Sequence, residues 1–122
     1  MKGLTTLSAS VALVAMTSFA LADEYKVSEL VVKKDLKAGQ PYTAALAYEK
    51  SGEPKIIEAC YLWSGEGPYC FKARDNKGNG QFESRLRTNN PGRYRLEGFI
   101  KYKVGNKTLE SNHASSTIIV KR

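Results

Sequence analysis

Short segments in which apolar and polar residues alternate follow one another along most of the chain. A period of two places successive side chains on opposite faces of a β-strand. Clusters of Gly, Pro, Asn and Ser separate these segments at short intervals, as turns do. The pattern predicts seven antiparallel strands, at 25–33, 42–49, 56–63, 69–74, 82–88, 93–104 and 115–121. No window has sustained helical periodicity, so we expect an all-β sandwich.

The same alternation predicts which side chains form the core. Trp63 is the largest of them. The side chains expected to point inward are Val27, Val31, Tyr42, Ala44, Leu46, Tyr48, Ile57, Ala59, Tyr61, Trp63, Tyr69, Phe71, Ala73, Tyr94, Leu96, Gly98, Ile100, Tyr102 and Val104.

Local register predicts a disulfide between the chain's two cysteines, Cys60 and Cys70. In an antiparallel hairpin whose turn centres on Gly65, Cys60 lies opposite Cys70 and Tyr61 lies opposite Tyr69. Alternation puts the cysteines on the outer face and the tyrosines on the inner one. Opposed residues lie within disulfide range, and closing this loop would stabilise the fold by roughly 3 kcal/mol in the chain-entropy model. A redox pair would instead need the C-x-x-C spacing.

At fold level the sequence resembles the immunoglobulin-like sandwich. The resemblance rests on about seven short strands in about 100 residues, and on Trp63 in the third strand. The segment Pro91-Gly92-Arg93-Tyr94, where the sixth strand begins, is similar to a tyrosine corner. Antibody-type domains join two strands across the core, whereas Cys60 and Cys70 would join neighbouring strands. The resemblance therefore implies the fold and no function.

The first 22 residues have the pattern of a secretory signal. Lys2 is followed by an apolar stretch, and Ala20-Leu21-Ala22 forms an A-x-A cleavage site. The apolar stretch is too short and too often interrupted by Ser and Thr to span a bilayer. No cysteine follows the cleavage site, so we do not expect a lipoprotein. We expect cleavage after Ala22, a β-sandwich domain at 23–122 in the periplasm or outside the cell, and no transmembrane segment afterwards.

Cleavage would leave 18 basic and 12 acidic residues, a net charge of +6, which favours anionic partners. In the sixth strand the outward residues form a basic stripe with an aromatic side chain at its centre. The candidate binding face comprises Arg93, Arg95, Phe99, Lys101 and Lys103, extended by Arg85 and Arg87 on the preceding strand. The alternative is a solvated face in which Glu97 pairs with its neighbours and Phe99 packs under a loop.

Nothing in the sequence indicates catalysis, a metal or another cofactor. His113 is the chain's one histidine, and no nucleophile motif accompanies it. The segment 75–80 has some EF-hand character, but Lys77 and Leu86 stand where oxygen ligands are needed, so we expect a turn. Nucleic acid is not an expected partner, because export separates the protein from it and a single Phe is a poor stacking platform.

These observations favour an exported, non-enzymatic interaction module that binds a protein or an anionic envelope component through its basic face. Two alternatives stay open. One is a small inhibitor of a hydrolase, with the turn Ser64, Gly65, Glu66, Gly67 and Pro68 as the insertion loop. The other is a secreted enzyme or accessory subunit that uses paired carboxylates.

Overall fold

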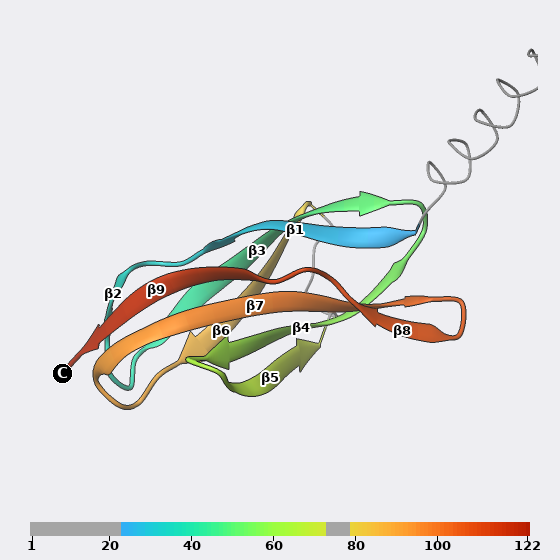
Figure 1. Cartoon of the computed structure of the whole chain (residues 1–122). Coiled ribbons are helices and arrows are strands. Elements are labelled where there is room, and N and C mark those ends of the chain that lie inside the picture. The colour runs from blue at the N-terminus through green and yellow to red at the C-terminus, as the bar shows by residue number, and fades with distance from the viewer. Residues whose placement is uncertain (1–22, 73–78) are drawn as a thin grey trace, which may run out of the picture.

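The computed structural model describes residues 23–72 and 79–122, and this part of the chain forms nine strands (Figure 1). The strands are β1 (Glu24–Val31), β2 (Asp35–Lys37), β3 (Pro41–Ser51), β4 (Lys55–Trp63), β5 (Glu66–Lys72), β6 (Gln81–Arg87), β7 (Gly92–Val104), β8 (Lys107–Glu110) and β9 (Ala114–Lys121).

The strands form two sheets that pack against each other as a sandwich. The smaller sheet has the order β1-β3-β6. The larger sheet has the order β2-β9-β7-β4-β5, and β8 pairs with β7 to form a hairpin that extends to one side (Figure 1). All pairings are antiparallel except that of β2 with β9. The expected all-β, immunoglobulin-like sandwich is confirmed.

The seven predicted strands correspond to β1, β3, β4, β5, β6, β7 and β9. Alternation missed β2 and β8, because strands of three and four residues give too few positions for a periodic signal. The predicted fourth strand ends at 72 in the described part of the chain, and its last two predicted residues, 73–74, lie outside that part.

Two bulges shift the predicted alternation. A bulge between Val27 and Glu29 in the β1–β3 pair leaves Val31 exposed and buries Leu30 instead. A second irregularity between Ile56 and Glu58 in the β4–β7 pair makes Ile56, and not the predicted Ile57, the residue packed on the core. One extra residue in a strand moves every later side chain to the other face.

The β4–β5 hairpin has the predicted register. Cys60 lies opposite Cys70 and Tyr61 opposite Tyr69, and the two cysteines form the predicted disulfide. Tyr69 shares the inner face with Tyr61, as predicted, but it is not part of the core, since 57% of this residue is exposed. The cause is topological: β5 is at the edge of the larger sheet, and a three-stranded sheet cannot cover the whole inner face of the larger one.

The core lies between the sheets and includes the predicted inward residues of β7. Leu96 and Ile100 are fully buried, and Gly98 lies against Tyr61 and Leu46 so closely that a Cβ there would be 2.9 Å from the Leu46 side chain. Above this layer, Tyr94 donates a hydrogen bond from its hydroxyl to the Asn90 carbonyl at 2.8 Å. This is the geometry expected of a tyrosine corner.

Trp63 lies at one end of the core and is half-buried. Its indole N–H points to two oxygens, the Tyr42 hydroxyl at 3.1 Å and the Thr88 hydroxyl at 3.0 Å. Those two hydroxyls are themselves 2.7 Å apart. The indole donor is thus satisfied by β3 and by the segment after β6, which ties the end of β4 to the opposite sheet.

Residues 23–72 and 79–122 include no helix that is long and apolar enough to cross a membrane.

Candidate functional site

The basic stripe of β7 lies on the outer face of the larger sheet, as alternation predicts. Two of its four cations have acidic neighbours: Arg95 is 3.9 Å from Glu97, and Lys101 is 3.8 Å from Glu58. Arg93 and Lys103 are exposed and form no ion pair with the described residues. Half of the stripe is therefore already neutralised by the sheet's own carboxylates.

Phe99, at the centre of the stripe, is only 3% exposed. The His113 ring stacks on it with centroids 4.4 Å apart and planes 6° apart, and His113 Nδ1 contacts the Glu97 carboxylate. On its other side Phe99 is opposite Cys60 in the β4–β7 register. The predicted aromatic contact is thus covered, as in the alternative of Phe99 packed under a neighbouring segment.

Arg85 and Arg87 do not extend the stripe. They lie on β6, which belongs to the smaller sheet, whereas the stripe lies on the larger one. Strict alternation along β6 exposes both arginines and buries Leu86 between them. The prediction that they extend the stripe assumed that consecutive strands are neighbours in one sheet. β6 and β7 are consecutive in the chain but lie in different sheets.

The turn expected to serve as an insertion loop is short. Trp63 pairs with Glu66, so only Ser64 and Gly65 form the turn, and Glu66, Gly67 and Pro68 belong to β5. Ser64 is fixed to β7 by two hydrogen bonds: its N–H donates to the Arg95 carbonyl at 2.9 Å, and its hydroxyl accepts from the Arg95 N–H at 3.2 Å.

A groove opens between the β4–β5 hairpin and β6, with a volume of about 630 Å³. One wall is aromatic and comes from the hairpin: Trp63, Tyr69 and Phe71. Arg85 and Arg87 line the opposite wall, on β6. The groove thus brings Arg85 and Arg87 together with Ser64 of the turn and Glu66 of β5, two sets of candidate residues that the sequence suggested separately.

The aromatic wall is pre-ordered. Tyr69 meets Trp63 edge to face with ring centroids 5.6 Å apart, and Tyr61 meets Phe71 in the same way at 6.0 Å. Trp63 is in turn fixed by its hydrogen bonds to the opposite sheet. Tyr69 is therefore exposed but already held in one orientation, so a ligand that binds to it loses less free energy to the ordering of this side chain. Sequence reasoning missed Tyr69 because alternation assigned it to the core.

Charge in the groove is unpaired. Neither Arg85 nor Arg87 has an ion-pair partner among the residues that the structure describes. The groove's acidic residue is Glu66, on the aromatic side. Aromatic side chains beside free arginines are the composition enriched at protein interfaces.

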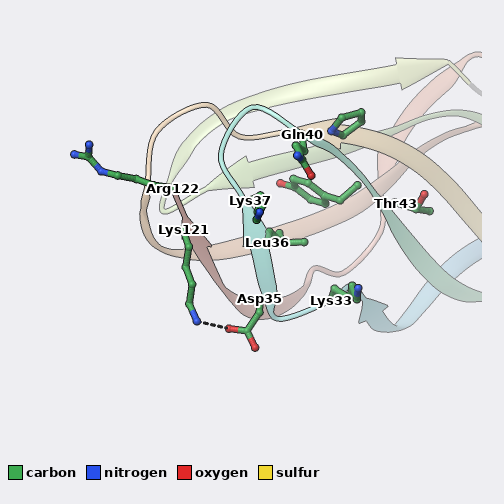
Figure 2. A pocket seen from close by; sticks show the side chains of 10 residues that line it. Lys33, Asp35, Leu36, Lys37, Gln40, Thr43, Lys121 and Arg122 are labelled. Atoms are coloured by element: carbon green, nitrogen blue, oxygen red, sulfur yellow. Dashed lines mark ion pairs between the residues drawn. The ribbon is translucent and has the colours of Figure 1, made fainter.

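A second pocket, of about 720 Å³, lies near β2 and the end of β9 (Figure 2). Leu36 and Tyr42 are its buried residues, and four cations lie around it: Lys33, Lys37, Lys121 and Arg122. Lys121 pairs with Asp35 at 3.8 Å, and Figure 2 shows the Arg122 side chain extending away from the others. These cations are exposed and do not converge on one point.

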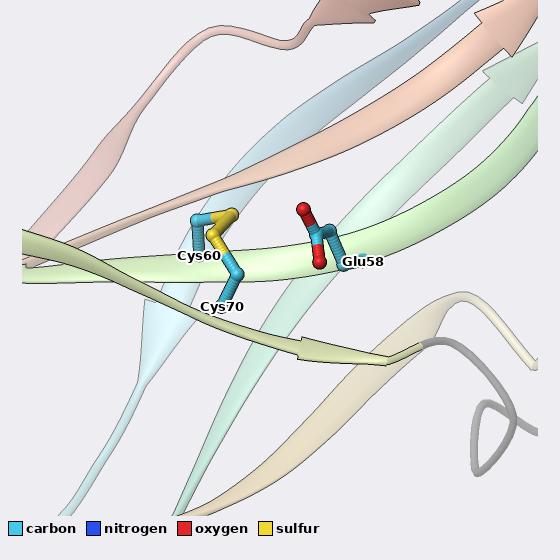
Figure 3. A group of neighbouring side chains, drawn as sticks. All are labelled: Glu58, Cys60 and Cys70. Atoms are coloured by element: carbon cyan, nitrogen blue, oxygen red, sulfur yellow. A yellow bond between two sulfur atoms is a disulfide. The ribbon is translucent and has the colours of Figure 1, made fainter.

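The potential metal ligands found together in residues 23–72 and 79–122 are Glu58, Cys60 and Cys70 (Figure 3). Both sulfurs are in the disulfide and cannot be thiolate ligands. The Glu58 carboxylate is the one donor left, and it lies 3.8 Å from Lys101. This cluster does not fit a metal site.

The remaining candidates from the sequence have structural partners. Ser111, near His113, uses its hydroxyl to accept from the Ile100 N–H and to donate to the Asn112 carbonyl, both at 2.8 Å. Of the turn predicted at 75–80, residues 75–78 lie outside the described part of the chain. At its end, the Asn79 side chain accepts from the Gln81 N–H at 3.2 Å, and Gly80 has a φ of 87°, as a turn requires.

Tyr61 is the strongly perturbed titratable group in the described structure. Burial raises the pKa of its hydroxyl to about 12, an effect that the nearby Ser84 hydroxyl partly offsets. Neither hydroxyl has a hydrogen-bond partner of good geometry among the described residues. Tyr61 is fully enclosed by the core, so the shift reflects burial and indicates no acid–base role.

The fold defines the class of protein: an immunoglobulin-like β-sandwich. Among solved structures, the chain is similar to the PKD domain of an M14-like peptidase from a Thermoplasmatales archaeon, with a TM-score of 0.53, 13% identity, and 83% of this chain and 100% of that chain covered. It is similarly close to the CARDB domain of a Pyrococcus furiosus protein in complex with di-metal ions, with a TM-score of 0.54, 11% identity, and 83% and 96% covered. No protein-family model and no curated protein matches the sequence. At these identities the similarity concerns the fold.

Proposed function

We propose that this protein is an exported, non-enzymatic interaction module that binds an acidic segment of another protein in the groove between the β4–β5 hairpin and β6. One observation carries the proposal. Tyr69 is 57% exposed on an ordered aromatic wall, opposite two arginines that lack ion-pair partners in the described structure.

The groove is a better candidate than the β7 stripe. In the stripe, Arg95 and Lys101 already have carboxylate neighbours, and the aromatic side chain is covered by His113. A ligand there would have to displace internal pairs, which reduces the net gain on binding. In the groove neither cost arises, because Arg85, Arg87 and Tyr69 meet solvent. The stripe, in which Arg93 and Lys103 have no ion-pair partner among the described residues, is the second place at which an anionic envelope component could bind.

Export is the second part of the proposal, and two observations support it. The N-terminal pattern of Lys2, an apolar stretch and Ala20-Leu21-Ala22 supports a cleaved signal. The disulfide supports it independently, because such bonds persist in oxidising compartments such as the periplasm. N-terminal sequencing of the protein from a periplasmic fraction should begin at Asp23, and an intact N-terminus on that protein would contradict the signal.

The inhibitor alternative is less well supported. An inhibitor needs a projecting loop that enters an active site, and here the turn consists of Ser64 and Gly65, with Ser64 bonded to β7. The residues that line the groove do not suggest a catalytic site either, since they include no histidine or cysteine and one carboxylate, Glu66.

The proposal is tested by affinity capture from envelope extract with three forms of the protein. The groove variant carries Tyr69→Ala, Arg85→Gln and Arg87→Gln, and the matched control carries Arg93→Gln, Arg95→Gln, Lys101→Gln and Lys103→Gln. A partner retained by the wild type and the control, and lost by the groove variant, supports the groove. Loss by the control alone would move the site to the stripe. Wild-type binding should weaken as salt rises from tens to hundreds of millimolar.

A further inference from the structure

We propose that the partner's segment binds as an added β-strand along the free edge of β6, which rests on the proposed function and specifies its geometry. In this mode an extended peptide forms main-chain hydrogen bonds with an unpaired sheet edge, and its alternate side chains enter adjoining pockets. The partner segment would therefore be extended, with apolar and acidic residues in alternation.

Among the described residues, β6 is a regular edge strand that pairs on one side only. It ends the order β1-β3-β6, and its pairing with β3 runs without a bulge from Pro41 opposite Arg87 to Ala47 opposite Gln81. Its exposure alternates strictly, and it contains no proline. Natural sheets normally blunt such an edge, because unpaired N–H and C=O groups recruit other strands.

The other long edge of the smaller sheet is blunted. β1 carries the bulge between Val27 and Glu29. The Asn112 side chain also binds both polar backbone groups of Val27, accepting from its N–H at 2.8 Å and donating to its carbonyl at 2.7 Å. An incoming strand would have to displace this amide.

The edges of the larger sheet are also unsuitable. β5 has Pro68 within it, which cannot donate to a neighbouring strand. β2 has three residues, too few to direct a stable pairing. β8 has four residues and is also short. Among the edge strands described, β6 therefore combines a length of seven residues with the absence of a bulge and of a proline.

The groove supplies the side-chain chemistry for such a strand. A strand beside β6 would direct alternate side chains toward the aromatic wall of Trp63, Tyr69 and Phe71, which lines the same groove as β6. The intervening side chains would lie next to Arg85 and Arg87 on the outer face, where carboxylates are favoured. Glu83, one position further along this face, disfavours acidic residues at that end and helps to set the register.

A second copy of this chain is a poorer occupant. Two β6 strands paired antiparallel with full overlap, centred on Ser84, would place Glu83 opposite Arg85 but Gln81 opposite Arg87. A second copy would therefore pair one of the two arginines of each strand with an acid, whereas an acidic segment can pair with both. A monomer with an open β6 edge is the expected state, and a partner with the opposite charge completes the sheet.

The experiment uses the exported protein and a fluorescein-labelled peptide of alternating Val and Glu, about eight residues long to match an ordinary strand. Three control peptides accompany it: one with Lys in place of Glu, one with scrambled order, and one with alternate backbone amides N-methylated. Fluorescence anisotropy measures affinity, and amide hydrogen exchange by mass spectrometry locates the binding strand. Light scattering establishes the oligomeric state.

Strand addition predicts that the Val–Glu peptide binds, that the Lys and scrambled peptides bind at least about tenfold more weakly, and that N-methylation along the pairing edge abolishes binding. Exchange should slow in β6 and not in β1. Arg85→Gln with Arg87→Gln should weaken binding about tenfold, whereas Arg93→Gln with Lys103→Gln should leave it unchanged.

Three results would overturn strand addition. If the N-methylated peptide binds as well as its parent, the groove holds side chains only, and the proposed function stands without the added strand. If no peptide binds while affinity capture still depends on Tyr69, Arg85 and Arg87, the same conclusion follows. A dimer in which β6 is protected from exchange would assign the edge to a second copy. Loss of both peptide binding and groove-dependent capture would instead reject the proposed function itself.

Discussion

The stripe on β7 and the groove beside β6 are similar in composition, because both bring arginine close to an aromatic side chain. In the stripe these residues share one strand, whereas in the groove the arginines come from β6 and the aromatic residues from the β4–β5 hairpin. On β7, Arg95 and Lys101 have carboxylate neighbours in the same sheet, and the ring of His113 covers Phe99. At the groove, Tyr69 and the arginines of β6 have exposed surfaces that no described residue neutralises.

The difference arises from position in the sandwich. β7 is a central strand, so neighbours on both sides supply Glu58 from β4 and the residue His113 before β9. β5 and β6 end their sheets and have a neighbour on one side only. Exposed and unpaired side chains are thus found on the strands that end a sheet, because those strands have fewer neighbours. The type of a residue does not show whether its strand ends a sheet.

The largest expected effect concerns the support of the groove. Trp63→Ala should lower the free energy of unfolding by roughly 3 kcal/mol, because it removes a large packed ring and leaves the Tyr42 and Thr88 hydroxyls without their donor. Urea unfolding measures it. Trp63→Phe is the control and should cost about half as much, because the ring packing is kept. A loss below about 1 kcal/mol for the alanine variant would mean that the ring contributes little to the core.

Removing the disulfide should separate the two regions. Cys60→Ser with Cys70→Ser should cost roughly 3 kcal/mol by the chain-entropy estimate, and the remaining structure should lose order first in β5, whose residues are nearly all exposed. Hydrogen exchange should then rise in β5 and stay unchanged at the outer face of β7. Equal loosening of both regions would show that the bond supports the whole sandwich and not the edge strand alone.

Alkaline pH tests the core beneath both regions. The pKa of Tyr61 is raised to about 12 in the folded protein from 10 in the unfolded chain, so its contribution to stability is complete below pH 10 and is lost as pH rises through 12. Relative to Tyr61→Phe, the wild type should lose about 1 kcal/mol between pH 9 and pH 11. At pH 9 the variant should be at least as stable as the wild type, since neither hydroxyl of the Tyr61–Ser84 pair is well bonded. A stability gap independent of pH would contradict the assigned pKa.

The smallest expected effect is on the stripe. Replacing Arg93, Arg95, Lys101 and Lys103 together with Gln should change the free energy of unfolding by less than about 1 kcal/mol, because partly exposed ion pairs contribute little. Thermal unfolding measures it, with Arg85→Gln and Arg87→Gln as the matched pair on β6. Unfolding of the quadruple variant would show that Glu58 and Glu97 depend on these cations for their solvation in the sheet.

Much of the fold could be predicted from the sequence, because it depends on local patterns. The β4–β5 register followed from the position of Gly65, and the disulfide followed from that register. Tyr94 could be placed in its corner from four consecutive residues. These features involve neighbours in sequence, and period-two alternation describes them well.

The site could not be predicted in the same way. Its two walls come from β5 and β6, which lie in different sheets, and alternation says nothing about which strand ends a sheet. For the same reason Tyr69 was expected to be buried, and Arg85 was expected beside the stripe of the larger sheet, although β6 belongs to the smaller one. The bulges near Val27 and Ile56 were equally invisible, because a single inserted residue leaves the local composition unchanged.

The Cys60–Cys70 bond also has a consequence for the order in which the chain can fold. Its cysteines are separated by 10 residues and lie opposite each other in a hairpin closed by a two-residue turn. Contacts of such short sequence separation form early, whereas the pairing of β2 with β9 must bring together segments from the two ends of the domain. Oxidation therefore needs only the first 70 residues, and it can fix the register of β4 and β5 before β7 arrives to pair with β4. The covalent bond then acts as a template: the last strands add to an edge whose alignment is already determined.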